Sequence, residues 1–185
     1  MTDIDDPLLT AFRAGEIIAY PTEAVYGLGC DPDNQAAVLR LLSLKRRPVE
    51  KGLILVARTY SQLLPYVNDA AIPMDRRTEI FSSWPGANTW LLPKSNKAPD
   101  WLTGGSELIA VRVSAHPLVQ RLCMLFDKPL ISTSANRTGE AAALTREAVI
   151  QQFSDKVIVL DGELGGAVKP SCIRNGLTGQ IIREN

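Results

Sequence analysis

Histidine and cysteine are scarce in this sequence, and their scarcity limits the chemistry that it can support. The 185 residues contain one histidine, His116, and three cysteines that match no metal-ligand spacing. An odd number of widely separated cysteines indicates reduced thiols in a reducing compartment. A lone histidine at a helix start is more often structural than catalytic, so no serine–histidine–aspartate triad is available. We expect neither a protein-ligated metal nor a nucleophilic triad.

Net charge and long apolar runs are absent as well. Twenty lysines and arginines balance twenty aspartates and glutamates. A strongly basic nucleic-acid binder is therefore not expected, although this balance is compatible with a local basic patch. No apolar run approaches the roughly 18 residues that cross a membrane, and the acidic N-terminus is unlike a signal peptide. The sequence predicts a cytoplasmic protein without membrane contact, folded as a single domain over residues 1–185.

The chain does contain a mixture of short apolar strands and short helices. Helices are expected at residues 7–14, 34–46, 59–67, 73–83, 114–127 and from 145 onward. Strands are expected at residues 16–20, 53–57, 87–92, 108–113, 129–131, 157–160, 171–174 and 180–183. Residues 93–107 are predicted to form a long loop. Because strands and helices do not alternate strictly, the pattern favours a mixed sheet with flanking helices.

Residues 129–139 (PLISTSANRTG) are the most informative stretch. An apolar strand entry runs into three hydroxyl side chains, an amide, an arginine and a glycine. Such a segment can present hydroxyls and backbone N–H groups to an anion. By itself it is better explained as a surface turn, because these residue types favour turns. In an extended segment Ser132, Ser134 and Asn136 would lie on one side, whereas Thr133 would point into the interior.

Two cations occupy positions where apolar residues would be expected. Lys45 continues the apolar stripe of its helix, so it either projects into a pocket or complements the helix dipole at the C-terminal end. Arg112 lies inside an apolar strand and needs a partner or a wet cavity. Cations and hydroxyl donors without a base are typical of sites that work by positioning and charge neutralisation. Phosphate transfer is the commonest reaction of that type.

Two common nucleotide-binding motifs are missing. No Gly-x-x-x-x-Gly-Lys-Ser/Thr sequence is present, which excludes a P-loop enzyme. Gly27 and Gly29 lack the third glycine and the helix of a dinucleotide-binding fingerprint, and a tight turn between strands would explain them. From its residues alone, the sequence predicts a site for a phosphorylated or carboxylated small molecule.

Six short motifs, each weak alone, occur together in this chain. They are residues 21–29 (PTEAVYGLG), 45–48 (KRRP), 84–86 (WPG), 111–113 (VRV), 132–136 (STSAN) and 170–171 (PS). In this order they resemble the YrdC/TsaC family of threonylcarbamoyl-AMP synthases, in its short single-domain bacterial form. The resemblance runs from Ile17 to Arg183. It implies an α/β fold with a twisted open mixed sheet and flanking helices around a large basic cavity.

The resemblance also implies roles for individual residues. The catalytic set of the family falls on Lys45, Arg47, Ser134 and Asn136. ATP would be bound by Arg47, Lys51, Ser134, Asn136 and Arg183. Threonine would be bound by Thr22, Arg112, Ser132 and Ser171.

The implied reaction joins L-threonine, bicarbonate and ATP. Threonine and bicarbonate give a carbamate, which attacks the α-phosphate of ATP and expels pyrophosphate. Mg²⁺ would accompany the phosphates, and no metal would be tightly held by the protein. The product would pass to the tRNA threonylcarbamoyl transferase machinery for t6A modification of tRNA, with contact to tRNA or other RNA as a further expectation.

The sequence departs from the family pattern at three positions. Cys172 stands where many relatives have threonine, Lys51 begins a Lys-Gly pair in place of Asn-Pro, and Val56 replaces a histidine. These departures leave the ligand contacts around Lys51 and Val56 open. The second domain of longer members is not present in the sequence, so we expect a loop, a partner or nothing to cover the cavity.

The alternative interpretation is a non-catalytic module that holds double-stranded or ribosomal RNA in the same basic concavity. Zero net charge and an aromatic content of 6% count against RNA binding as the primary role.

Overall fold

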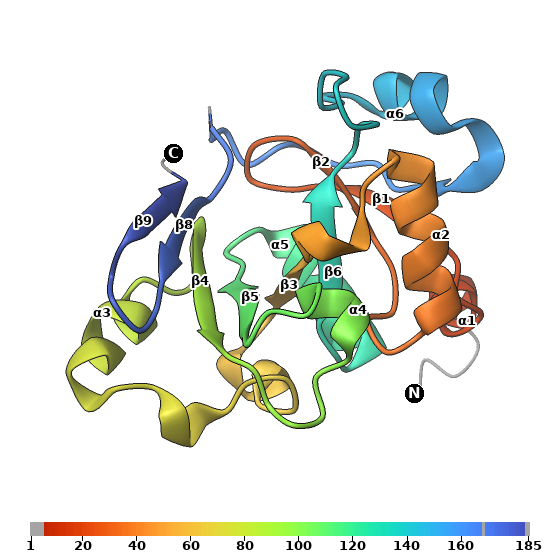
Figure 1. Cartoon of the computed structure of the whole chain (residues 1–185). Helices are drawn as coiled ribbons and strands as arrows, with labels where there is room; N and C mark the ends of the chain where they lie inside the picture. Colours follow the sequence, from red (N-terminus) through yellow and green to blue (C-terminus); the bar gives the residue numbers. More distant parts are fainter. Residues whose placement is uncertain (1–5, 168, 184–185) are drawn as a thin grey trace.

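The sheet of this protein is mixed and spans the molecule. The computed structural model describes residues 6–167 and 169–183 (Figure 1). Its strands are β1 (Ile18–Pro21), β2 (Tyr26–Gly29), β3 (Ile54–Ala57), β4 (Asn88–Pro93), β5 (Leu108–Val113), β6 (Leu130–Ser134), β7 (Ile158–Val159), β8 (Cys172–Asn175) and β9 (Ile181–Arg183). In the described part of the chain they form one sheet in the order β7-β1-β2-β6-β3-β5-β4-β8-β9. The pairs β1–β7, β3–β5 and β4–β8 are parallel and the others antiparallel. The predicted mixed sheet is thus confirmed.

Short helices flank this sheet. They are α1 (Pro7–Arg13), α2 (Gln35–Lys45), α3 (Arg77–Ser82), α4 (Asp100–Thr103), α5 (Pro117–Phe126) and α6 (Arg146–Phe153). Three predicted helix starts are confirmed, because Asp6, Asn34 and Thr145 each accept a hydrogen bond from a backbone N–H in the first turn. No helix in residues 6–167 or 169–183 is long and apolar enough to cross a membrane.

Several local predictions are wrong. The helix expected at 59–67 is a 3₁₀ turn over Tyr60–Leu63, and the loop at 93–107 contains α4. The helix expected at 73–83 is confirmed over α3, but residues Met74–Arg76 before it form a 3₁₀ turn. His116, and not Ser114, caps α5, because its Nδ1 accepts from the N–H of Leu118 at 3.2 Å. The N-cap is the residue directly before the first helical residue. Because proline is favoured at that first position and α5 begins at Pro117, the N-cap is His116.

The two glycines of the YGLG segment lie within β2 and do not form a turn. A Cβ atom at Gly29 would stand 2.1 Å from the carbonyl oxygen of Ile131 in β6. The side chain of Tyr20 reaches the same carbonyl and donates to it at 2.7 Å. Glycine is therefore needed here for the close approach of β2, β6 and the tyrosine ring.

Alternation along the strands divides the core between two faces of the sheet. α1 and α5 cover one face, where Phe12 stacks on Phe126 with ring centroids 3.9 Å apart. The apolar residues of α2, α4 and α6 pack in the larger cluster against the other face. Val56 and Leu130 lie under α5, so Ile54, two residues before Val56 in β3, and Ser132, two residues after Leu130 in β6, share their face. Beyond α5 that face carries polar side chains.

Candidate active site

The polar part of this face forms the floor of a cavity of about 400 Å³, a volume within the range of small-molecule sites. Strand ends and loops that are distant in sequence contribute its walls. Eight of the ten predicted site residues line it: Thr22, Arg47, Arg112, Ser132, Ser134, Asn136, Ser171 and Arg183. Lys45 and Lys51 do not.

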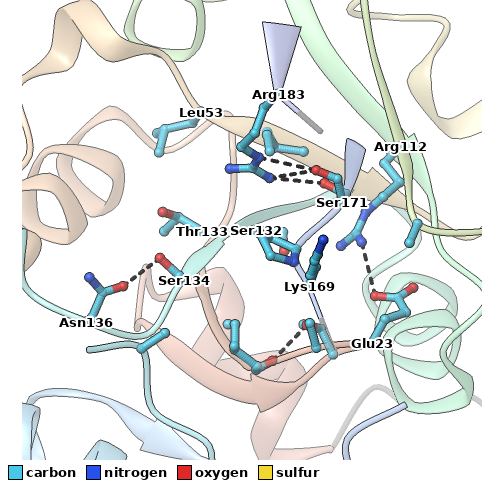
Figure 2. Close-up of a pocket in the computed structure, with 18 of the residues that line it drawn as sticks. Glu23, Leu53, Arg112, Ser132, Thr133, Ser134, Asn136, Lys169, Ser171 and Arg183 are labelled. Atoms are coloured by element: carbon cyan, nitrogen blue, oxygen red, sulfur yellow. Dashed lines mark hydrogen bonds and ion pairs between the residues drawn. The ribbon is translucent and has the colours of Figure 1, made fainter. Parts of the chain in front are cut away.

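The labelled side chains extend across the cavity from one end to the other (Figure 2). Ser134 and Asn136 lie at one end, and Arg112 with Glu23 lies at the other. Ser132, within β6, lies between them. The cavity can therefore hold an elongated ligand, or two ligands placed end to end.

Positive charge exceeds negative charge in this cavity. Among the described lining residues there are four cations, from three arginines and Lys169, against the two carboxylates of Glu23 and Glu140. Burial, and then the neighbouring Arg183, lower the pKa of Arg47. Burial, and then Arg112, lower the pKa of Arg183. Crowded, desolvated cations of this kind favour the binding of an anion.

Arg112 has both the partner and the cavity that its position in β5 required. It is 6% exposed, and its Nη1 lies 3.1 Å from Oε2 of Glu23. Oε1 of Glu23 accepts a hydrogen bond from Ser114 Oγ at 2.6 Å. Burial acts to raise the pKa of Glu23, but Arg112 and Ser114 outweigh it and hold that pKa below its ordinary value. The Nε of Arg112 is buried and has no partner among the described residues.

The segment after β6 is shaped by its own side chains. Ser134 Oγ donates to Oδ1 of Asn136 at 2.6 Å, and Asn136 Nδ2 donates to the carbonyl of Glu140 at 2.9 Å. β6 ends at Ser134, so the extended spacing relates Ser132 to Ser134 but does not reach Asn136. Thr133 is half-buried and lines the cavity. The expectation of an interior Thr133 is wrong, because β6 ends one residue later and leaves the sheet open there.

Lys45 supports the loop and does not face the cavity. It is 3% exposed, and its ammonium donates to the carbonyls of Ser134 and of Asn136, the latter at 2.9 Å. In return the N–H and the hydroxyl of Thr138 donate to the carbonyl of Lys45, at 2.7 and 3.0 Å. The side chain thus fastens the loop to the C-terminus of α2, whose last carbonyls need donors. One of the two sequence interpretations placed Lys45 in the pocket. The structure does not, because Lys45 is not among the described lining residues.

Two further predicted residues hold the walls. Ser171 accepts at its carbonyl from Arg183 Nη2 at 3.0 Å, and its hydroxyl lies 2.9 Å from the hydroxyl of Thr89. Thr22 donates from its hydroxyl to the carbonyl of Val25 at 2.7 Å and so closes the turn between β1 and β2. Both hydroxyls are committed to protein partners, although their residues line the cavity.

The positions that depart from the family pattern lie outside the cavity lining. Lys51 is exposed in the 3₁₀ turn Val49–Lys51, Val56 is buried beneath α5, and Cys172 is buried in β8. The charged lining residues that sequence reasoning missed are Glu23, Glu140 and Lys169. Glu23 lies next to Thr22 and Lys169 two residues before Ser171, so nearness to predicted residues was the available signal.

Comparison with known proteins places this fold and cavity in a family. A sequence model of the Sua5/YciO/YrdC family, described as "Telomere recombination", matches residues 10–185. The chain belongs to this family.

Individual relatives agree with that assignment. A threonylcarbamoyl-AMP synthase of Pseudoalteromonas atlantica is 63% identical over 181 residues, covering 98% of this chain and 97% of the relative. Another, from Pseudoalteromonas translucida, is 55% identical over 176 residues, covering 95% and 94%. The solved structure of P. abyssi Sua5 complexed with L-threonine matches with a TM-score of 0.82 at 32% identity. That match covers 91% of this chain and 49% of the Sua5 chain, so this chain spans about half of that protein.

Replacing Lys45 with methionine should destabilise the fold far more than the same change at Arg47. Methionine leaves the carbonyls of Ser134 and Asn136 without a buried donor, which costs about 1–3 kcal/mol. Lys45→Met should therefore unfold at a lower denaturant concentration. Arg47→Met loses one hydrogen bond, to the carbonyl of Gly52 at 3.1 Å, but also removes a desolvated cation beside Arg183, so its stability should change far less. Equal losses in both variants, measured by chemical denaturation, would contradict the separate roles.

The stability of the protein should also rise with pH as Lys45 titrates. Burial, assisted by Arg47, lowers the pKa of Lys45 from 10.5 to about 8. Between these values the unfolded chain binds more protons than the folded one, so the free energy of unfolding increases with pH. This stabilisation is lost as the pH falls through the folded-state pKa of Lys45, about 8. The difference in unfolding free energy between wild type and Lys45→Met should widen from about pH 7 to about pH 10. A constant difference would refute the shift.

Proposed function

We propose that this protein is a threonylcarbamoyl-AMP synthase, which makes L-threonylcarbamoyladenylate and pyrophosphate from L-threonine, bicarbonate and ATP. The observation that carries the proposal is the cavity, whose crowded arginines and hydroxyl-lined floor suit two anionic ligands at once. The names of relatives that match over nearly the whole chain support the same activity.

The geometry suggests how the two ligands divide the cavity. Arg112 takes the carboxylate of threonine, because its guanidinium lines the cavity and its planar fork suits a carboxylate. Ser132 lies beside that end. Arg47, Ser134, Asn136 and Arg183 take the ATP phosphates at the other side. Lys51 is exposed outside the lining and has no place in this proposal.

The chemical step then needs positioning more than acid–base catalysis. The threonine amine and bicarbonate give a carbamate and water. A carbamate oxygen attacks the α-phosphorus, and the bond to the bridging oxygen of pyrophosphate breaks. Arginines near the phosphates neutralise the charge that collects on pyrophosphate. Holding the carbamate and the α-phosphate in line removes most of the entropic barrier.

Mg²⁺ would enter with the ATP phosphates and screen their charge. Among the described residues, no group of three or more histidine, cysteine, aspartate or glutamate side chains could hold a metal ion. The described cavity lining has two carboxylates, from Glu23 and Glu140. Two carboxylates are too few to fill the six coordination positions of Mg²⁺ without phosphates and water. Mg²⁺ bound mainly by phosphates and water fits this donor set.

The cellular setting is also part of the proposal. Cys30, Cys123 and Cys172 are free and buried, which suits a reducing cytoplasm. We place residues 1–185 in one domain, since β1 and β9 belong to the same sheet. The adenylate would be handed to the tRNA threonylcarbamoyl transferase machinery, and the excess positive charge of the cavity is compatible with contact to tRNA.

Incubation with ATP, bicarbonate and L-threonine should release pyrophosphate and form the adenylate, and Arg112→Lys should impair the use of threonine selectively. A lysine cannot bind the carboxylate through two parallel hydrogen bonds. The KM for threonine should therefore rise roughly tenfold or more, and that for ATP far less. Equal effects on both KM values would show that Arg112 serves the phosphates. Absence of pyrophosphate release by the wild type, with RNA binding that falls steeply with salt, would favour the RNA module.

Ser134→Ala should reduce turnover with little loss of stability. Ser134 is exposed to the cavity, so water replaces its hydroxyl in the folded variant. In the complex its hydroxyl would turn from Oδ1 of Asn136 to a phosphate oxygen, and such a donor is worth about tenfold or more in rate. Paired melting and pyrophosphate-release measurements check both halves of this statement. A variant with normal turnover would remove Ser134 from the phosphate site.

A further inference from the structure

Glu23 is a cavity carboxylate for which the reaction as described has no use. It lies opposite Arg112 and points toward it (Figure 2). A carboxylate offers about four acceptor positions. Arg112 and Ser114 occupy two of them. Acceptor positions of Glu23 therefore remain available to a ligand.

Arg112 has a matching vacancy. Its Nη1 is occupied by Glu23, while its Nε is buried without a partner among the described residues. The guanidinium lines the cavity, so a ligand acceptor can reach the donors that Glu23 leaves free. A carboxylate that takes the Nε side of the guanidinium leaves Glu23 in contact with the opposite side. An anion site and a cation site thus lie next to each other, at the 3.1 Å of the Arg112–Glu23 contact.

We propose that Glu23 accepts a hydrogen bond from the ammonium group of the bound amino acid, so that Glu23 and Arg112 together select a zwitterion. The ammonium and carboxylate of an α-amino acid are separated by one carbon, and such a ligand needs adjacent sites of opposite charge. The inference rests on the proposed function and names the residue that recognises the amino group.

The charge state of Glu23 suits this role. Burial acts against ionisation, but Arg112, and then the hydroxyl of Ser114, hold the pKa of Glu23 below its ordinary value. The group is therefore an anion at neutral pH and accepts hydrogen bonds at both oxygens. Glu140, the other carboxylate of the lining, is exposed, and no ion pair to it occurs in the described chain.

The backbone of Glu23 is held as firmly as its side chain. The N–H of Ala167 donates to the carbonyl of Glu23 at 2.9 Å, and that of Gly165 donates to the carbonyl of Thr22 at 2.9 Å. A Cβ atom at Gly165 would stand 2.9 Å from the Cα of Glu23. The loop from β7 to β8 thus packs directly on this residue. A side chain that is already fixed in this way loses little conformational entropy when a ligand binds.

A simpler role for Glu23 is to neutralise Arg112, as in any buried ion pair. The two roles differ in what they predict for a ligand without an ammonium group. β-Hydroxybutyrate is threonine with hydrogen in place of that group, and it retains the carboxylate and the hydroxyl. An ion-pair role affects threonine and β-hydroxybutyrate alike, whereas ammonium recognition affects threonine alone.

Isothermal titration calorimetry of the full chain with each compound tests the proposal. The wild type should bind L-threonine roughly tenfold or more tightly than β-hydroxybutyrate, the effect of a hydrogen bond between charged groups. In Glu23→Gln this ratio should fall close to one, because both carboxylate oxygens face donors and the amide carries no charge. The matched control Glu140→Gln removes the same charge from the same cavity and should keep the ratio.

The proposal is overturned if Glu23→Gln keeps the wild-type ratio, or if the wild type binds both compounds equally or neither. Should Glu23→Gln fail to fold, Ser114→Ala provides the second variant. It leaves the charge of Glu23 but removes its 2.6 Å donor, and the ratio should fall in the same direction by a smaller factor. An unchanged ratio in Ser114→Ala, with β-hydroxybutyrate still bound more weakly in the wild type, would assign the discrimination to another residue.

These binding measurements are independent of the product assay. A wild type that prefers threonine tenfold but releases no pyrophosphate would refute the synthase and support zwitterion selection. A wild type that makes the adenylate while Glu23→Gln keeps its ratio would support the synthase and refute the role of Glu23.

Discussion

A buried ammonium group joins the two layers from which the site is built. Lys45 ends α2 on one side of the sheet, and its hydrogen bonds hold the loop that follows β6. The position of Ser134 and Asn136 in the cavity therefore depends on a residue that never reaches it. Burying a charge costs free energy, and the lowered pKa of Lys45 records that cost. Two carbonyl acceptors compensate for it, so the loop and the helix are stable only together.

The cavity itself is an assembly of charges that repel one another. Burial and then Arg112 lower the pKa of Arg183, and burial and then Arg183 lower the pKa of Arg47. Glu23 relieves this repulsion at one end only. Anionic ligands would relieve it throughout, and a protein that binds them gains stability by mass action. The arrangement is therefore better suited to the occupied state than to the empty one, as is common in functional sites.

Sequence patterns predicted the parts of this site that depend on local rules. Arg112 stood out because it interrupts an apolar strand, and the hydroxyl segment at 132–136 because it follows a strand end. The mixed sheet followed from the order of its elements. The role of Lys45 was not decided, because a helix stripe fixes the direction of a side chain but not the acceptors that it meets. Glu23 was missed because its partners come from β5 and from the loop at 161–167, which only the folded chain brings together.

The cavity draws on residues near both ends of the described chain. Thr22 follows β1, whereas Arg183 ends β9, and β1 and β9 lie toward opposite edges of the sheet. While β8 and β9 are still inside the ribosome during synthesis, Ser171 and Arg183 are not yet part of the cavity. At that stage the chain has one wall of the cavity open and lacks one of the cations of its lining. The lining of the cavity is therefore completed only after β9 has been synthesised.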